Sequence, residues 1–427
     1  MGSGSTGNDG HDLAELTRGL DERLDLADKR LLAQYPGTGG ARQPVHTVYV
    51  PADQVRPGFS GDWGTRALAA LTEHAPDAER LAAVTGIEPA AVRASYPRML
   101  AKLRAEPIED FRVDLEDGYG TRDEATEDAD ARAAAEALCA ELAAGIAPPY
   151  VGLRMKGMEA AGRARGMRSL TLFLDTLLSG HGRLPDGFVL TLAKITSVDQ
   201  VEAMVWATEW LESHFGLNAG QLTFELQVET PQSVLAPDGT VAVARMVHAG
   251  AGRVTALHYG TYDYSAACGV TAAYQSMAHP VADHAKAVMQ LAAAGTGVWL
   301  SDGSTNVLPS GTEAEVHEGW RLHAQLVRRS LERAYYQGWD LHPAQLPTRY
   351  LATYVFYREA FGPAAHRLRS YFTAAGGSIL DEPATAQALA VALVRGLNCG
   401  ALESAEVAEA TGVTVAELRE LASRRIG

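Results

Sequence analysis

Residues 222–264 read LTFELQVETPQSVLAPDGTVAVARMVHAGAGRVTALHYGTYDY, and this stretch contains the repeating unit that decides the fold. It begins with an apolar run that ends in the polar sequence VETP. An Ala-rich helical segment follows, and a second apolar run then ends in YGTYDY. The order of strand, polar turn, helix and strand is typical of a parallel sheet whose strands are connected by helices.

The same unit recurs along the chain. Short apolar runs, each with a polar or Gly-rich turn, occur about eight times, the number of strands that closes a (β/α)8 barrel. We therefore predict an α/β fold, a (β/α)8 TIM barrel with additional N-terminal and C-terminal helices. The remaining runs are VHTVYVPAD (45–53), DFRVDLEDGYG (110–120), PYVGLRMKG (149–157), GFVLTLAKITS (187–197), TGVWLSDGS (296–304) and GWDLHPAQLP (338–347).

The segments outside the repeated unit give the expected domain organisation. Small polar residues at 1–10 predict a flexible tail, and leucines at three- and four-residue spacing predict a helical segment at 11–44. The catalytic barrel is expected at 45–348, with a helical insertion at about 77–106 after the first strand. A C-terminal helical extension is expected at 349–427.

Composition excludes several classes of protein. The 427 residues include 37 Lys and Arg against 52 Asp and Glu, a net charge of -15, which argues against nonspecific nucleic-acid or membrane binding. The three cysteines form no CxxC pair, and no apolar run approaches the roughly 20 residues that span a bilayer. We therefore expect a cytoplasmic protein with neither nucleic-acid nor membrane partners.

Polar residues follow the apolar runs at the ends where a barrel collects its active-site side chains. Their recurrence in nearly every unit is hard to explain in a purely structural protein, so we expect a site at this mouth. The residues are Asp53, Asp114, Glu116, Asp117, Arg154, Lys194, Glu229, Asp263, Asp302 and His342.

Glu229 and Asp263 follow successive runs, so a barrel would place them side by side. Two carboxylates with open coordination positions suit Mg2+ or Mn2+, which prefer oxygen ligands and retain sites for water or substrate. In the alternative interpretation, Glu229 caps a helix and Asp263 orders a turn. Arg154 on the same rim favours the metal site.

Arg154 is the expected partner of an anionic substrate, because a guanidinium binds a carboxylate through two parallel hydrogen bonds. A structural pairing of Arg154 with Asp114 or Glu116 is the competing interpretation, and the two roles are compatible. The acidic loop is expected to order Arg154 and metal-bound water, or to supply the proton-transfer group. Lys194 is interpreted as an electrostatic or structural lysine, with a Schiff-base nucleophile as the alternative.

The histidines allow two interpretations. His342 and His258 end apolar runs, where a direct role competes with ordinary hydrogen-bonded structure, and we take His342 as a candidate substrate-binding residue. His317 and His323 flank a helical stretch on different faces. We therefore interpret that pair as solvated helix residues rather than as metal ligands.

The order and spacing of these motifs resemble the HpcH/HpaI aldolase/citrate lyase family, particularly its citrate lyase beta-subunit-like branch, within the phosphoenolpyruvate/pyruvate barrel superfamily. The likeness extends from about Val45 to Leu346 and includes TVYVPAD, VDLEDG, GLRMKG, LAKI, VETP, YGTYD, SDG and LHPAQ. The resemblance implies that Glu229 and Asp263 bind a divalent metal, usually Mg2+, and that Arg154 contacts the oxo-acid end of the substrate.

The function implied by the resemblance is that of a Mg2+-dependent carbon-carbon lyase or aldolase. Such an enzyme acts on a 2-oxo acid, a hydroxy acid or an acyl-CoA thioester through a metal-stabilised enolate, and the loop with Asp114 and Glu116 would support the site. Tyr262, where the family has small or acidic residues, and Tyr264 are expected to line and narrow the mouth, which counts against a large thioester. Homo-oligomers are usual in the family.

Two alternative functions keep the same barrel. One is a phosphoenolpyruvate-type phosphoryl-transfer enzyme, although neither a GxxxxGK[ST] loop nor a GxGxxG after a strand supports nucleotide chemistry. The other is a metabolite-binding protein without turnover, whose helical tail engages a protein partner. The complete set of Asp114, Arg154, Glu229 and Asp263 favours the enzyme.

Overall fold

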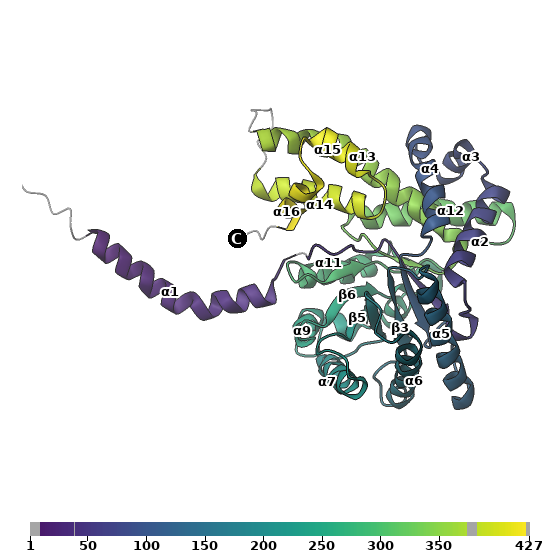
Figure 1. The fold of residues 1–427 in the computed structure, drawn as a ribbon, viewed down its shortest axis with the longest axis horizontal. Helices are drawn as coiled ribbons and strands as arrows, with labels where there is room; N and C mark the ends of the chain where they lie inside the picture. The colour runs from purple at the N-terminus through teal and green to yellow at the C-terminus, as the bar shows by residue number, and fades with distance from the viewer. Residues whose placement is uncertain (1–8, 38, 374–381, 424–427) are drawn as a thin grey trace, which may run out of the picture.

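A ring of parallel strands surrounded by helices forms the body of the protein, and further helices lie against it (Figure 1). The computed structural model describes residues 9–37, 39–373 and 382–423. The tail predicted at 1–10 lies mostly outside these ranges, and only its last two residues are described, as the start of helix α1 (Asp9–Gln34).

The strands lie in the order β7-β6-β5-β4-β3-β2-β1-β8, and every neighbouring pair is parallel. A parallel bridge between Ser301 and Gln337 brings β7 beside β8, and the Asp302 amide donates to the Gln337 carbonyl at 2.8 Å. The predicted (β/α)8 barrel is therefore confirmed. The strands are β1 (Thr47–Pro51), β2 (Asp110–Asp114), β3 (Tyr150–Met155), β4 (Phe188–Leu192), β5 (Thr223–Val228), β6 (Val254–Tyr259), β7 (Trp299–Ser301) and β8 (Trp339–Asp340).

Helices fill the connections between the strands. Helix α4 shows how the sequence sets their starts: Pro89 is its first residue, and the Glu88 side chain accepts the Ala91 amide at 2.9 Å. The helices after α1 are α2 (Phe59–His74), α3 (Ala78–Thr85), α4 (Pro89–Ala105), α5 (Glu124–Ala144), α6 (Arg163–His181), α7 (Val198–Phe215), α8 (Pro231–Val234), α9 (Ala242–Ala249), α10 (Thr261–Ala267), α11 (Pro280–Ala293), α12 (Glu313–Glu332), α13 (Leu346–Thr373), α14 (Pro383–Asn398), α15 (Ser404–Thr411) and α16 (Val415–Ser423), with short 3-10 helices η1 (Ala52–Gln54), η2 (Ala272–Tyr274) and η3 (Pro343–Gln345).

Strand alternation decides which side chains enter the barrel. In β2, Asp110, Arg112 and Asp114 point inward, and Arg112 reaches across to Glu225 on β5 at 2.9 Å. The intervening Phe111 points outward into the apolar core between strands and helices. A strand with this composition therefore contributes polar groups to the barrel interior and apolar groups to the surrounding layer.

Glu225 is the centre of a polar network inside the barrel. The hydroxyls of Tyr49 and Thr191 donate to it at 3.0 and 2.6 Å, and His258 Nε2 lies 3.1 Å from its second oxygen. Arg112 supplies the opposite charge, which a carboxylate buried at this depth requires. His258 is thereby a structural residue of the interior network.

The end of β8 is fixed by a second buried cluster. Asp340 lies 2.8 Å from His46 Nδ1 and 3.0 Å from His323 Nε2, and it accepts from Arg349 Nη2 at 2.9 Å. All four side chains are buried. The expectation that His323 is a solvated helix residue is wrong, because β8 provides a carboxylate partner that draws its ring into the core.

Helices α13 to α16 lie together on the side of the barrel away from α6 and α7 (Figure 1). Helix α13 joins the two parts, because Tyr350 and Tyr354 belong to the barrel core and Leu368 belongs to a separate apolar cluster with Leu393 and Leu418. Within the described part of the chain, every helix is too short or too polar to cross a membrane.

Candidate active site at the carboxyl ends of the strands

Arg154, in β3, is held by Asp114 at the end of neighbouring β2. The guanidinium donates through Nε to Oδ1 at 2.7 Å and through Nη2 to Oδ2 at 2.6 Å. Its remaining nitrogen, Nη1, makes only long contacts, 3.5 Å to Gln227 Oε1 and 3.7 Å to Glu116 Oε2. The structural pairing expected from the sequence is thus present, and Nη1 is the guanidinium nitrogen with the weakest contacts.

The Asp114 carboxylate also organises the acidic loop that follows it. Its two oxygens accept the amides of Glu116 and Gly118, each at 2.9 Å. A Cβ atom at position 118 would lie 2.5 Å from Asp114 Oδ2, so this turn requires glycine. The loop therefore fixes Asp114 from one side while Arg154 fixes it from the other.

Two residues that sequence reasoning missed complete the support of Arg154. The guanidinium carbon lies 4.7 Å from the centre of the Tyr49 ring, a cation-π arrangement. Gln227 donates to the Tyr49 hydroxyl at 3.2 Å while its oxygen faces Arg154. Strand alternation could have identified Gln227 from the sequence, because Gln227 shares the inward face of β5 with Glu225.

Lys194, just past β4, lies among three carboxylates of the mouth. Its ammonium is 2.8 Å from Glu116, 2.5 Å from Asp117 and 3.5 Å from Asp263. Although partial burial lowers it, the hydrogen bonds and charges of Glu116 and Asp117 raise the pKa of Lys194 above its ordinary value. A Schiff-base nucleophile needs a lowered pKa, so this environment favours the electrostatic interpretation.

Glu229, which follows β5, is buried at the same mouth. Its Oε2 accepts the Lys194 amide at 3.0 Å, and a Cβ at Gly260 would lie 2.2 Å from its Cγ. Burial first, and then the like charges of Glu116 and Asp263, raise the pKa of Glu229 to about 8, against the opposing effect of Arg154. Burial is therefore the main reason why Glu229 holds its proton more tightly than an ordinary carboxyl, and the carboxylates of Glu116 and Asp263 add to this effect.

The carboxyl groups gathered at this mouth are the feature that fits a divalent cation. Among the described residues, no group of three or more His, Cys, Asp or Glu side chains is arranged to hold a metal. Mg2+, however, is commonly bound by one or two carboxylates and keeps several waters. Glu229 and Asp263 supply two oxygen donors of this kind on neighbouring βα connections, so the donor chemistry suits such an ion.

The raised pKa of Glu229 predicts how stability responds to pH. A carboxyl whose folded-state pKa lies above its unfolded value stabilises the fold at low pH, and this contribution is lost as pH rises towards about 8. We therefore compare the Tm of Glu229→Gln with that of the unaltered chain, both without metal. The difference in favour of the variant should grow by about 2–5 °C as the pH rises from about 5 to 8.5. Thermal melts across this pH range measure the difference in Tm between the two proteins. A difference that stays constant with pH would contradict the prediction.

Three further polar residues expected at the mouth have structural partners of their own. Asp302 accepts from Lys286 Nζ of α11 at 2.9 Å and from Ser330 of α12 at 2.6 Å, so it ties the barrel to its helical layer. His342 caps η3 through the Ala344 amide at 3.2 Å. Asp53, in η1, lies 3.5 Å from Arg122. Among the described residues, no hydrogen bond or ion pair joins His342 to Arg154 or Glu229.

The two rim tyrosines differ in placement. Tyr262 is only partly buried in α10, beside Asp263, and its hydroxyl accepts the Asn306 amide at 2.6 Å, which ties α10 to the connection after β7. Tyr264 is buried against Tyr259, with ring centres 5.5 Å apart. The expectation that Tyr264 narrows the mouth is wrong, because its ring belongs to the apolar core.

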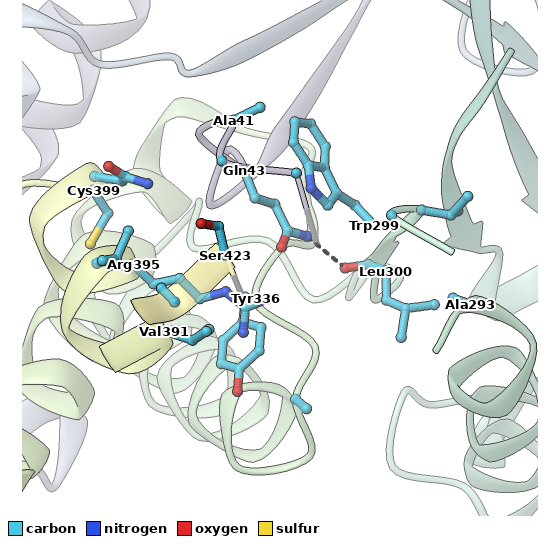
Figure 2. Close-up of a pocket in the computed structure, with 18 of the residues that line it drawn as sticks. Ala41, Gln43, Ala293, Trp299, Leu300, Tyr336, Val391, Arg395, Cys399 and Ser423 are labelled. Carbon is cyan, nitrogen blue, oxygen red and sulfur yellow. Dashed lines mark hydrogen bonds between the residues drawn. The ribbon is translucent and has the colours of Figure 1, made fainter. Parts of the chain in front are cut away.

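Two cavities lie at the opposite, amino-terminal ends of the strands. One, of about 300 Å3, lies between the barrel and α14 and α16, where the Arg395 guanidinium is 3.8 Å from the centre of the Tyr336 ring (Figure 2). The other, of about 870 Å3, lies beneath β3 to β7. Neither contains the Arg154 and Glu229 groups, and (β/α)8 barrels place catalytic residues at the other end.

Comparison with known families identifies the chain. Residues 24–426 match the family described as Domain of unknown function (DUF6986). The chain belongs to this family. Comparison with curated proteins gave no match.

Solved structures to which this chain is similar include the following three. A citrate lyase from Burkholderia xenovorans LB400 is 19% identical, with a TM-score of 0.54 over 90% of this chain and 98% of that one. A citrate lyase beta subunit from M. tuberculosis, complexed with oxaloacetate and magnesium, is 16% identical, with a TM-score of 0.42 over 74% and 98%. A Haloferax volcanii malate synthase is 13% identical, with a TM-score of 0.48 over 89% and 88%. The first match confirms, at the level of fold, the resemblance expected from the motifs.

Proposed function

We propose that this protein is a divalent-metal-dependent carbon-carbon lyase or aldolase that acts on a 2-oxo acid or a related hydroxy acid or thioester. One observation supports this most strongly. At the carboxyl ends of the strands, a buried arginine that Asp114 orients lies at the same mouth as the carboxyl groups of Glu229 and Asp263. An arginine of this kind binds an anionic substrate, and the carboxylates suit a cation.

Arg154 binds and orients the substrate in this proposal. Asp114 accepts hydrogen bonds from two nitrogens of the Arg154 guanidinium, and the Tyr49 ring lies against the guanidinium face. The guanidinium is therefore fixed before any ligand arrives. Fixed donors aimed at developing negative charge stabilise a transition state more than mobile ones do, because no reorganisation is needed. The Nη1 edge, which makes only long contacts with Gln227 and Glu116, therefore receives the carboxylate or oxyanion of the oxo acid.

Glu229 and Asp263 would hold the metal. A divalent cation bound there supplies a Lewis acid that lowers the barrier to breaking or forming the carbon-carbon bond next to a carbonyl. Lys194 keeps its proton and balances the acidic loop. Glu116 is our candidate for proton transfer, because burial raises its pKa and it lies within 4 Å of both Arg154 and Lys194.

Calorimetric titration tests the proposal directly. The metal-free protein is titrated with Mg2+ or Mn2+, then with pyruvate, oxaloacetate, glyoxylate or acetyl-CoA in the presence and absence of metal. We expect an oxo acid to bind only with metal, and Glu229→Ala or Asp263→Ala to weaken metal binding by about 10–100-fold. Asp53→Ala, which removes a carboxylate from another strand end, serves as the matched control and should leave the affinity unchanged.

Two results would overturn this assignment. One is metal affinity in both variants equal to that of the unaltered chain, and the other is oxo-acid binding that does not depend on metal. Mass spectrometry of the reaction mixtures identifies turnover of the acid that binds. Release of phosphate from phosphoenolpyruvate would instead establish the phosphoryl-transfer alternative.

A further inference from the structure

Helix α1 projects away from the body of the molecule (Figure 1). Seven leucines of this helix are between 50% and 62% exposed. An isolated helix is marginally stable in water, and helices in proteins are stabilised mainly by packing of an apolar face. These exposures therefore indicate that α1 has a partner outside the single chain. The leucines are Leu13, Leu16, Leu20, Leu24, Leu26, Leu31 and Leu32.

Most of these side chains form one narrow stripe. At about 100° per residue, Leu13, Leu16, Leu20, Leu24, Ala27 and Leu31 fall within roughly 80° of the helix circumference. The stripe runs through about five turns of the helix and contains no charged residue. A continuous seam of this width is typical of a helix that pairs with another helix.

Charged residues flank the stripe asymmetrically. Asp21 and Asp28 project on one side of it, and Arg23 and Arg30 project on the other. When two copies of such a helix pair in parallel, the acidic flank of each meets the basic flank of the other. An antiparallel pair instead places acid against acid and base against base, so the charges select the parallel arrangement.

The spacing of these charges also matches a parallel pair. Residues five positions apart on the two helices face one another across the edge of a parallel coiled coil. Arg23, which directly precedes Leu24 of the stripe, therefore meets Asp28 of the second copy. The stripe spacing includes one extra four-residue step, at Leu20 to Leu24, which loosens the supercoil without breaking the seam.

Other occupants fit the stripe less well. Helix α1 has seven acidic and four basic residues, a charge that anionic membranes repel. The exposed tryptophans of α7, Trp206 and Trp210, provide an apolar face, but α7 has no Lys or Arg to complement the acidic flank of α1. A second α1 offers both the apolar seam and the complementary charge.

We propose that α1 is a self-association element that pairs in parallel with α1 of a second copy of this chain. The base of the helix is attached to the barrel, because Tyr35 contacts the His248 ring at 5.6 Å and the Gly37 amide donates to the Gly295 carbonyl at 2.9 Å. Pairing of the helices therefore joins two complete barrels near their amino-terminal ends.

Cysteine cross-linking in the full-length chain tests the orientation. Leu13→Cys and Leu31→Cys are each made in a Cys268→Ser background, because Cys268 is the exposed native thiol. A parallel pair places each new cysteine opposite its own copy, so each variant should form a covalent dimer alone. Cross-links that form only when the two variants are mixed, or none at all, overturn the proposal.

Substitutions within the stripe test the surface. Leu20→Glu with Leu24→Glu should raise the dissociation constant of the dimer, measured by sedimentation, by about a hundredfold or more. The matched control is Leu26→Glu, because Leu26 is 59% exposed but lies off the stripe. Arg23→Asp or Asp28→Arg alone should weaken association, and the double exchange should restore it. Equal dissociation constants for the stripe and control variants overturn the proposal.

Discussion

Replacing Arg154 with methionine is expected to lower kcat/KM by about a thousandfold while leaving the protein folded. The substitution removes the guanidinium edge that, in the proposed function, receives the negative charge of the substrate. Asp114 keeps the amides of Glu116 and Gly118 as donors, so the acidic loop retains its shape. Turnover is measured with the oxo acid that the metal titration identifies.

Two further variants show whether that loss comes from the Arg154 guanidinium itself. Arg154→Lys keeps the charge but loses the double hydrogen bond to Asp114, so we expect an intermediate loss, and this variant tests the role should methionine unfold the chain. Arg168→Met is the control, because Arg168 also pairs with a carboxylate, Asp128, but does so on the outside of the barrel. Activity of Arg154→Met within a few-fold of the unaltered enzyme would make Arg154 purely structural.

Asp340→Ala is expected to cost about 3–5 kcal/mol of unfolding free energy. Asp340 accepts from Arg349 and contacts His46 and His323, and all four groups are buried. Its removal leaves the Arg349 guanidinium in the core without a carboxylate. Urea denaturation at neutral pH measures the loss, and a cost below about 1 kcal/mol would show that the cluster relaxes.

The same cluster predicts an acid limit to stability. Burial raises the pKa of Asp340, but the Arg349 charge and the histidine hydrogen bonds outweigh it and hold the pKa well below its usual range. The stabilisation that Asp340 provides is therefore complete above the ordinary carboxyl pKa and is lost only in strong acid.

Asp62→Ala is the matched control for Asp340→Ala. It removes an exposed carboxylate paired with Arg66 at 3.5 Å and should cost under about 1 kcal/mol of unfolding free energy.

Strand positions and the candidate mouth were predictable from sequence, because their signals are local. Each strand is a short run with inward and outward alternation that ends in a turn. A parallel barrel then brings the strand ends together whatever their separation in the chain. This topology explains why Arg154, Asp114, Glu229 and Lys194 could be assigned to one site before their contacts were known.

The sequence by itself determined the barrel, its polar mouth and the leucine spacing of α1, since these follow from residue order and periodicity. Only the tertiary structure decided that Tyr49 and Gln227 support Arg154, that His323 is buried, and that the α1 stripe has no partner within the described chain. The physical reason is that a side chain's environment depends on residues far away in sequence. Tyr49 meets Gln227 across the barrel, and no local pattern encodes that contact.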